Sequence, residues 1–172
     1  MSIEPDTKDW TWVLERPCPE CSYDSAAVDP ARLPTAMRAT SRRWKQALAD
    51  PDCAVRPADN VWSPLEYACH VRDVHRVFDE RLGRMLDEED PLFANWDQDA
   101  TAVQDRYDEQ DPATVARELV EAAGAVADRY AGVTGDQWSR TGRRSDGARF
   151  TVDTLGRYHL HDVEHHLYDV GS

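Results

Sequence analysis

The sequence lacks a long apolar run. No stretch reaches about 18 apolar residues, which is the shortest length expected of a membrane-spanning helix. The N-terminus, Met-Ser-Ile-Glu-Pro-Asp, also lacks the basic segment followed by an apolar segment that marks a secretory signal. We therefore expect a soluble protein of the cytoplasm.

Positive charge is scarce as well. Lysine occurs only at Lys8 and Lys45, and 20 Lys and Arg residues stand against 33 Asp and Glu residues, for a net charge of −13. A surface of that sign repels phosphate backbones and anionic lipids, so we expect neither nucleic acid nor membrane as a partner. Small molecules are not excluded. The preference for arginine over lysine is typical of a GC-rich bacterial genome.

Cysteine is limited to four residues, Cys18, Cys21, Cys53 and Cys69. In a cytoplasmic chain, thiols and metal ligands are more common than disulfides. Three interpretations stay open for the pair Cys18-Pro-Glu-Cys21. It supplies two ligands of a structural zinc site, it is a redox dithiol with one thiol of lowered pKa, or it has no chemical role. Cys53 and Cys69 do not form the second closely spaced pair that a four-cysteine zinc site usually has.

The chain length suits one folded domain with a short extension. We expect residues 1–29 to form an N-terminal extension that carries the Cys-x-x-Cys pair. Because Trp10, Trp12 and their neighbours are apolar, this extension should lie against the body of the protein, residues 30–172.

Apolar spacing predicts four helices, at residues 30–49, 63–87, 112–131 and 151–170. Ser63-Pro64-Leu65-Glu66 is a strong helix start, with Ser63 as N-cap and Glu66 completing a capping box. The connection 88–111 is longer than antiparallel neighbours usually need, so we expect it to cross over and leave the second and third helices parallel. The turn-rich segment 132–147 is compatible with a small hairpin. The predicted fold class is all-α, a four-helix bundle.

Four of the six histidines lie in the stretch Tyr158-His-Leu-His-Asp-Val-Glu-His-His-Leu-Tyr-Asp169. On a helix, His161 and His165 share one face with Cβ atoms about 5–6 Å apart, close enough to bind one metal ion. His70 lies on the apolar side of the second helix, where a buried imidazole needs a hydrogen bond or a metal. If the second and fourth helices are antiparallel neighbours, the three histidines reach a similar depth in the bundle. We therefore predict His70, His161 and His165 as metal ligands.

Other polar residues near these positions have less specific roles. Asp162, four residues before His166, is a candidate to pair with it on the helix face, and Asp73 or Asp169 is a candidate to hold the outer N–H of a ligand imidazole. Tyr67 is a candidate for lining a pocket. We expect the remaining histidines to lie on other helix faces, exposed to solvent: His75, His159 and His166.

Two segments resemble a known family. Trp62-Ser-Pro-Leu-Glu-Tyr-Ala-Cys-His70-Val-Arg-Asp-Val and Leu160-His161-Asp162-Val-Glu-His165-His166 are similar to the DinB-like superfamily of four-helix bundles, over about residues 30–170. That superfamily includes mycothiol- and bacillithiol-dependent transferases and the mycothiol-dependent maleylpyruvate isomerase. The resemblance implies an up-down-down-up bundle with the long crossover between helices two and three, often dimeric. It also implies a divalent metal held by His70, His161 and His165.

Three neutral imidazoles leave at least one coordination position open, which is the arrangement of a catalytic zinc site. Zinc, or nickel or iron(II) on the same ligands, activates a bound thiol or water. The resemblance favours a metal-dependent S-transferase or isomerase that uses mycothiol or a related low-molecular-weight thiol with a small-molecule electrophile. The alternatives are hydrolysis, a non-enzymatic metal-binding or interaction module, and a redox switch in which Cys18 or Cys21 is a fourth ligand.

Overall fold

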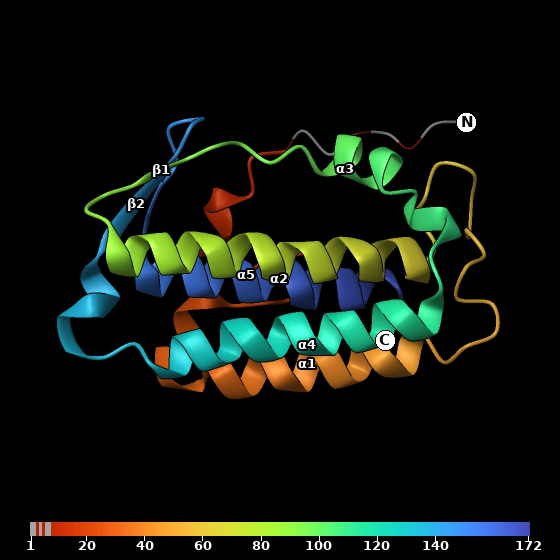
Figure 1. Ribbon diagram of the computed structural model, residues 1–172, viewed down its shortest axis with the longest axis horizontal. Coiled ribbons are helices and arrows are strands. Elements are labelled where there is room, and N and C mark those ends of the chain that lie inside the picture. Colours follow the sequence, from red (N-terminus) through yellow and green to blue (C-terminus); the bar gives the residue numbers. More distant parts are fainter. Residues whose placement is uncertain (1–2, 4, 6–7) are drawn as a thin grey trace.

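Four long helices form the body of the computed structural model, which describes residues 3, 5 and 8–172 (Figure 1). They are α1 (Leu33–Ala47), α2 (Pro64–Asp87), α4 (Pro112–Ala131) and α5 (Val152–Asp169). Helices α1 and α5 run in one direction and α2 and α4 in the other, so the bundle is up-down-down-up, as predicted (Figure 1). Each long helix packs between two others: α4 and α5 both contact α1 and α2. Helices α2 and α5 are therefore antiparallel neighbours.

The helix starts follow from local side-chain chemistry. Ser63 accepts a hydrogen bond from the backbone N–H of Glu66, whose carboxylate accepts one from the N–H of Ser63, which confirms the predicted capping box. Thr151 caps α5 by accepting from the N–H of Thr154. Asp111 caps α4, in which Pro112 takes the first position.

The crossover and the hairpin meet in a small sheet at one end of the bundle. Strands β2 (Thr141–Arg144) and β3 (Arg149–Thr151) pair antiparallel, as the predicted hairpin. Strand β1 (Leu92–Phe93) in the crossover pairs parallel with β2, which periodicity did not reveal because two residues carry no pattern. The crossover then forms the short helix α3 (Gln98–Gln104).

The core consists of two apolar clusters. One surrounds Phe78 and Leu155 near the sheet, and the other surrounds Trp44 and Leu167. Gly156 allows α5 to approach α1 closely, because a Cβ there would lie 2.5 Å from a methyl group of Leu33. The clusters hold α5 firmly against both α1 and α2.

The N-terminal extension lies along α5. It contains two short 3-10 helices, Thr11–Leu14 and Ser25–Ala27, and both contact α5. The hydroxyl of Tyr23 donates to the carbonyl of Arg157 on α5, at 2.7 Å. Positions 1–2, 4 and 6–7 of the predicted extension 1–29 lie outside the described residues.

Over the part of the chain that the structure describes, each helix is either too short or too polar to cross a membrane.

Candidate metal centre

Helix α5 carries two pairs of chemically reactive side chains, each with a spacing of four residues. His161 and His165 form one pair, and Asp162 and His166 form the other. Because consecutive positions on an α-helix lie about 100° apart around its axis, the two pairs face different neighbours. The first pair faces the N-terminal extension and the second faces α2.

The pair that faces α2 meets His70. One ligand atom from each of His70, Asp162 and His166 lies within 4.8 Å of the other two. Oδ1 of Asp162 is 3.6 Å from Nε2 of His70 and 3.7 Å from Nε2 of His166. These distances exceed those of ordinary hydrogen bonds, and they leave a space between two ring nitrogens and one carboxylate oxygen.

The electrostatics of this cluster suit a cation. His70 is 1% exposed, and neither of its ring nitrogens has a hydrogen-bond partner among the described residues. Burial lowers the pKa of His70, so the ring is neutral at pH 7 and its nitrogen lone pair is available. Burial alone would raise the pKa of Asp162, but the proximity of the His70 and His166 imidazoles lowers it below its ordinary value. Two imidazoles and one carboxylate are ligands that zinc and iron(II) both accept.

Neighbouring side chains hold the ligands in place. Nδ1 of His166 lies 2.8 Å from Oδ2 of Asp169, so this carboxylate accepts the outer N–H and leaves Nε2 facing the cluster. The ring of Trp96 stacks on His70, with centroids 5.5 Å apart and planes 6° apart. Tyr67 packs on His166 at 5.1 Å. The imidazole orientations are thus fixed by packing as well as by hydrogen bonding.

A cavity of about 710 Å³ opens beside the cluster. Asp162 and His166 lie in its wall, together with the aromatic rings of Trp62, Tyr67 and Trp96. Trp10 and Glu20 of the extension and His161 and His165 of α5 also line it. The volume of the cavity lies within the range of small-molecule binding sites.

The pair that faces the extension meets the Cys-x-x-Cys segment. One ligand atom from each of Cys18, Cys21, His161 and His165 lies within 4.8 Å of the others. Burial lowers the pKa of His161 to about 4 and raises the pKa of the Cys21 thiol to about 11. The Cys21 thiol is therefore protonated at pH 7 in the metal-free protein, so Cys21 is not the reactive thiolate of a redox pair.

The structure distributes the three predicted ligands over these two clusters. His70 lies with Asp162 and His166, whereas His161 and His165 lie with the two cysteines. Among the described residues, no set of ligand atoms within 4.8 Å of one another unites all three. The reason is the rotation of about 100° between adjacent positions on α5.

The expectation that three histidines are exposed was wrong. His75 and His159 are fully buried, and Nδ1 of His75 lies 3.0 Å from Nε2 of His159, between α2 and α5. The side chain of His166 is 20% exposed and lies in the cluster with His70 and Asp162. Its position was detectable in the sequence, since Asp162 and His166 have the same spacing as His161 and His165. Asp162, predicted as a supporting carboxylate, lies among the candidate ligands themselves.

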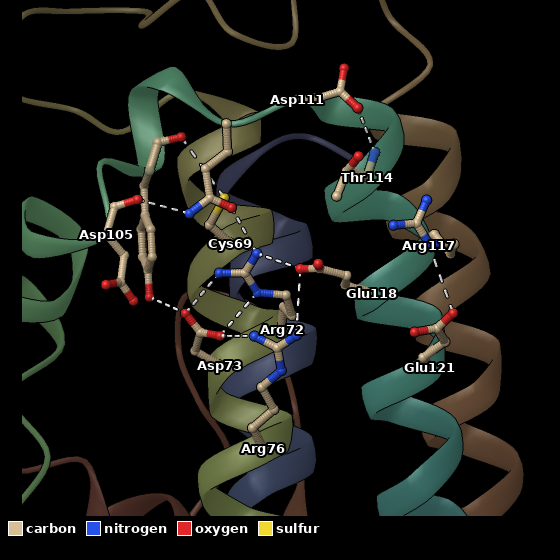
Figure 2. Close-up of polar contacts among 12 residues, drawn as sticks. Cys69, Arg72, Asp73, Arg76, Asp105, Asp111, Thr114, Arg117, Glu118 and Glu121 are labelled. Atoms are coloured by element: carbon tan, nitrogen blue, oxygen red, sulfur yellow. Dashed lines mark hydrogen bonds and ion pairs between the residues drawn. The ribbon is translucent and has the colours of Figure 1, made fainter.

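Asp73, another predicted supporting carboxylate, lies in a separate ionic network between α2 and α4 (Figure 2). Arg72 donates to Asp73 at 2.9 Å and to Glu118 at 2.9 Å. Tyr107 donates its hydroxyl to Asp73 at 2.6 Å. Burial alone would raise the pKa of Asp73, but the bonds from Arg72 and Tyr107 lower it. These contacts link the parallel helices α2 and α4.

Comparisons with known proteins agree with this architecture. The family model described as the DinB superfamily matches residues 34–170. The chain is also similar to the solved structure of YfiT from Bacillus subtilis, with a TM-score of 0.73, 21% sequence identity, and coverage of 83% of this chain and 85% of that chain. YfiT is described as a probable metal-dependent hydrolase with an unusual four-helix bundle topology. No curated protein sequence matches this chain. Because the family model spans most of the sequence, the chain belongs to the DinB superfamily.

Proposed function

We propose that this protein is a divalent-metal-dependent enzyme in which His70, Asp162 and His166 hold the metal. The observation that carries the proposal is the convergence of these three side chains, from α2 and α5, beside a cavity of about 710 Å³. Both ring nitrogens of His70 lack a hydrogen-bond partner among the described residues. A metal there would provide a partner for Nε2, the nitrogen that faces Asp162. Zinc is the metal we propose, and nickel or iron(II) would accept the same ligands.

Three protein ligands leave coordination positions for a substrate atom. When bound, a divalent metal lowers the pKa of a thiol or of water in such a position. The single negative charge of Asp162 offsets part of the metal charge. Asp169 keeps the ring of His166 oriented through its 2.8 Å contact with Nδ1.

The reaction that we propose is transfer of a low-molecular-weight thiol of the mycothiol kind to a small electrophile, or a thiol-dependent isomerisation. In the transfer, the thiol loses its proton to solvent, its sulfur bonds to the electrophilic carbon, and the leaving group departs with the bonding electron pair. The cavity accommodates a ligand of this size, and its lining suits a polyhydroxylated thiol. The rings of Trp62 and Trp96 offer apolar faces, while Asp97 and Asp99 offer acceptors for hydroxyl groups.

Hydrolysis is the second candidate, because YfiT, with the same fold, is described as a probable metal-dependent hydrolase. The same three ligands would serve it, with water in place of the thiol. The nucleophile therefore distinguishes the two candidates.

The test compares the metal-loaded protein with Asp162→Asn, which keeps the shape of the side chain and removes its charge. Mycothiol and a fluorogenic electrophile are the substrates in one arm, and a panel of activated esters and amides in the other. We expect metal-dependent conjugation that falls at least about a hundredfold in the variant, since even supporting residues of a metal site contribute about 10–100-fold. The control for the chemical change is Asp136→Asn, which alters an exposed aspartate that belongs to neither ligand cluster.

Ester or amide cleavage without conjugation would replace the transferase with the hydrolase. Conjugation at the same rate in chelated and metal-loaded protein would overturn the role of the metal. Stoichiometric metal with no turnover in either arm would indicate a non-enzymatic metal-binding module.

A further inference from the structure

We propose that Cys18, Cys21, His161 and His165 form a second metal centre, a structural zinc site that fastens the N-terminal extension to α5. This centre is separate from the cluster of His70, and the inference does not depend on the proposed function. Cys18 and Cys21 lie outside the region matched by the family model, which begins at residue 34, whereas His161 and His165 lie inside it.

The ligand atoms of the four side chains lie near enough to one another for a single zinc ion. Bond lengths of about 2.3 Å to sulfur and about 2.0–2.1 Å to nitrogen place ligand atoms about 3.3–3.8 Å apart. Sγ of Cys18 already lies 3.7 Å from Nδ1 of His165. The remaining ligand atoms lie within 4.8 Å of one another, so small side-chain movements complete the site.

The backbone presents both pairs in the required way. The N–H of Ser22 donates to the carbonyl of Cys18 at 2.9 Å, and the N–H of Cys18 donates to the carbonyl of Tyr23 at 2.8 Å. This tight turn directs both thiols toward α5. The pattern Cys-x-x-Cys with His-x-x-x-His has the pair spacings of Cys₂His₂ zinc sites, here with the two pairs far apart in the sequence.

The surroundings of the histidines match those of ligands. His161 is 3% exposed, and its Nε2 has no hydrogen-bond partner among the described residues. Nε2 of His165 lies 3.5 Å from Glu20 and 3.7 Å from Asp169, while its Nδ1 faces Cys18. The two carboxylates lie on the side of the outer nitrogen, at distances longer than ordinary hydrogen bonds, and the inner nitrogen faces the centre.

The charge of the assembled site favours burial. Two thiolates balance the charge of one Zn²⁺, and the two imidazoles are neutral, so the buried unit carries no net charge. Trp10 covers the site, with its ring 5.6 Å from that of His161 and 4.9 Å from that of His165. Four protein ligands leave no open position, which is the mark of a structural site.

The extension is also held by the Tyr23 bond to Arg157 and by the packing of Leu14, Tyr23 and Val28 against the core, but few of its side chains are fully buried. Only three side chains between residues 8 and 29 are buried, Val13, Cys18 and Ser25, and its helices are single 3-10 turns. A metal crosslink would add to these contacts and stabilise a segment in which few side chains are fully buried. Because Trp10 and Glu20 line the cavity of about 710 Å³, the zinc centre would also fix one wall of that cavity.

Cobalt substitution tests the proposal. The full-length protein is freed of metal, loaded with Co²⁺, and examined for the near-ultraviolet charge-transfer band of thiolate-bound cobalt and the intense visible bands of tetrahedral cobalt. We expect both in the wild-type protein. Replacement of one ligand, in Cys18→Ser or His161→Asn, should remove or strongly weaken them, while Cys53→Ser, which changes a buried cysteine elsewhere, should leave them intact.

Asp162→Asn separates this proposal from the proposed function. The variant should keep the thiolate band and lose one of two zinc ions per chain in elemental analysis, whereas Cys18→Ser should lose the other. Absence of a thiolate band in the folded wild-type protein would overturn the proposal without the need for any variant. A band that persists unchanged in both His161→Asn and His165→Asn would also overturn it, because the cysteines would then bind metal without α5.

Discussion

Asp73 and Asp79 lie on the same helix and both pair with arginine, but their surroundings differ. Asp73 and Arg72 have side chains only 11% and 5% exposed, whereas Asp79 and its partner Arg129 are 23% and 41% exposed. Removing one member of a buried pair leaves the other charge uncompensated, while an exposed pair is screened by water. The two residues therefore form a matched test of how burial determines the contribution of an ion pair to the free energy of unfolding.

We predict that Asp73→Ala lowers the free energy of unfolding by about 3 kcal/mol, because Arg72 stays buried without its main partner. Asp79→Ala should cost less than about 1 kcal/mol. Urea unfolding measures both. Metal content should stay unchanged in Asp73→Ala, and a loss of zinc in that variant would return Asp73 to the role of a supporting carboxylate.

For single residues, the sequence indicated which side chains are candidate metal ligands but not which neighbours they contact. His70 and the spacing of His161 and His165 were visible in the sequence. The choice between this pair and Asp162 with His166 depends on the rotation of α5 about its axis, which apolar spacing defines only to within about one residue, or about 100°. The Cys-x-x-Cys pair was visible too, but its contact with α5 is set by tertiary structure alone.

Helices α2 and α5 are joined inside the bundle by the contact between His75 and His159. The ring of Phe78 stacks on His159 at 4.5 Å, and no water-exposed surface remains on either imidazole. Burial lowers the pKa of His75 to about 4, and burial and the proximity of His75 lower the pKa of His159 well below its ordinary value. Both rings are therefore neutral in the folded protein at pH 7.

We predict that the chelated protein loses stability as the pH falls from about 6.5 toward 4. In this range the unfolded chain takes up protons that the folded chain does not bind, and each such histidine costs about 1.4 kcal/mol per pH unit. Above about pH 6.5 the contribution is fully present. In His159→Gln the slope of the free energy of unfolding against pH should decrease by about 1.4 kcal/mol per pH unit, which corresponds to one proton. Urea unfolding at pH 7, 6 and 5 measures this slope. An identical slope in the two proteins would contradict this explanation.

Most helix boundaries were predictable because the cues are local. Ser63 with Glu66 and Thr151 at the start of α5 act within one helical turn, so the sequence alone indicates where these helices begin. The parallel arrangement of α2 and α4 followed from the length of the crossover. Strand β1 was not predictable, because Leu92 and Phe93 become a strand only by pairing with β2.

For the whole molecule, the extension and the bundle are expected to depend on each other through metal. We predict that removing zinc increases amide hydrogen exchange in residues 8–29 by at least about tenfold, which corresponds to about 1.4 kcal/mol of lost local stability. Exchange in α4, which contributes to neither metal cluster, should change little. Mass spectrometry of zinc-loaded and chelated protein measures both segments. Equal exchange of residues 8–29 in the two states would show that apolar contacts alone hold the extension.

The surroundings of α5 restrict how the chain can change in length. Within one stretch of six residues, four side chains face the extension or α2, Val163 enters the core, and Glu164 pairs with Arg43 of α1 at 3.2 Å. An extra residue inserted inside the helix would turn every later side chain toward the wrong neighbour. An insertion in the hairpin before Thr151 should be tolerated better than one inside α5, because a longer loop leaves the orientation of α5 unchanged.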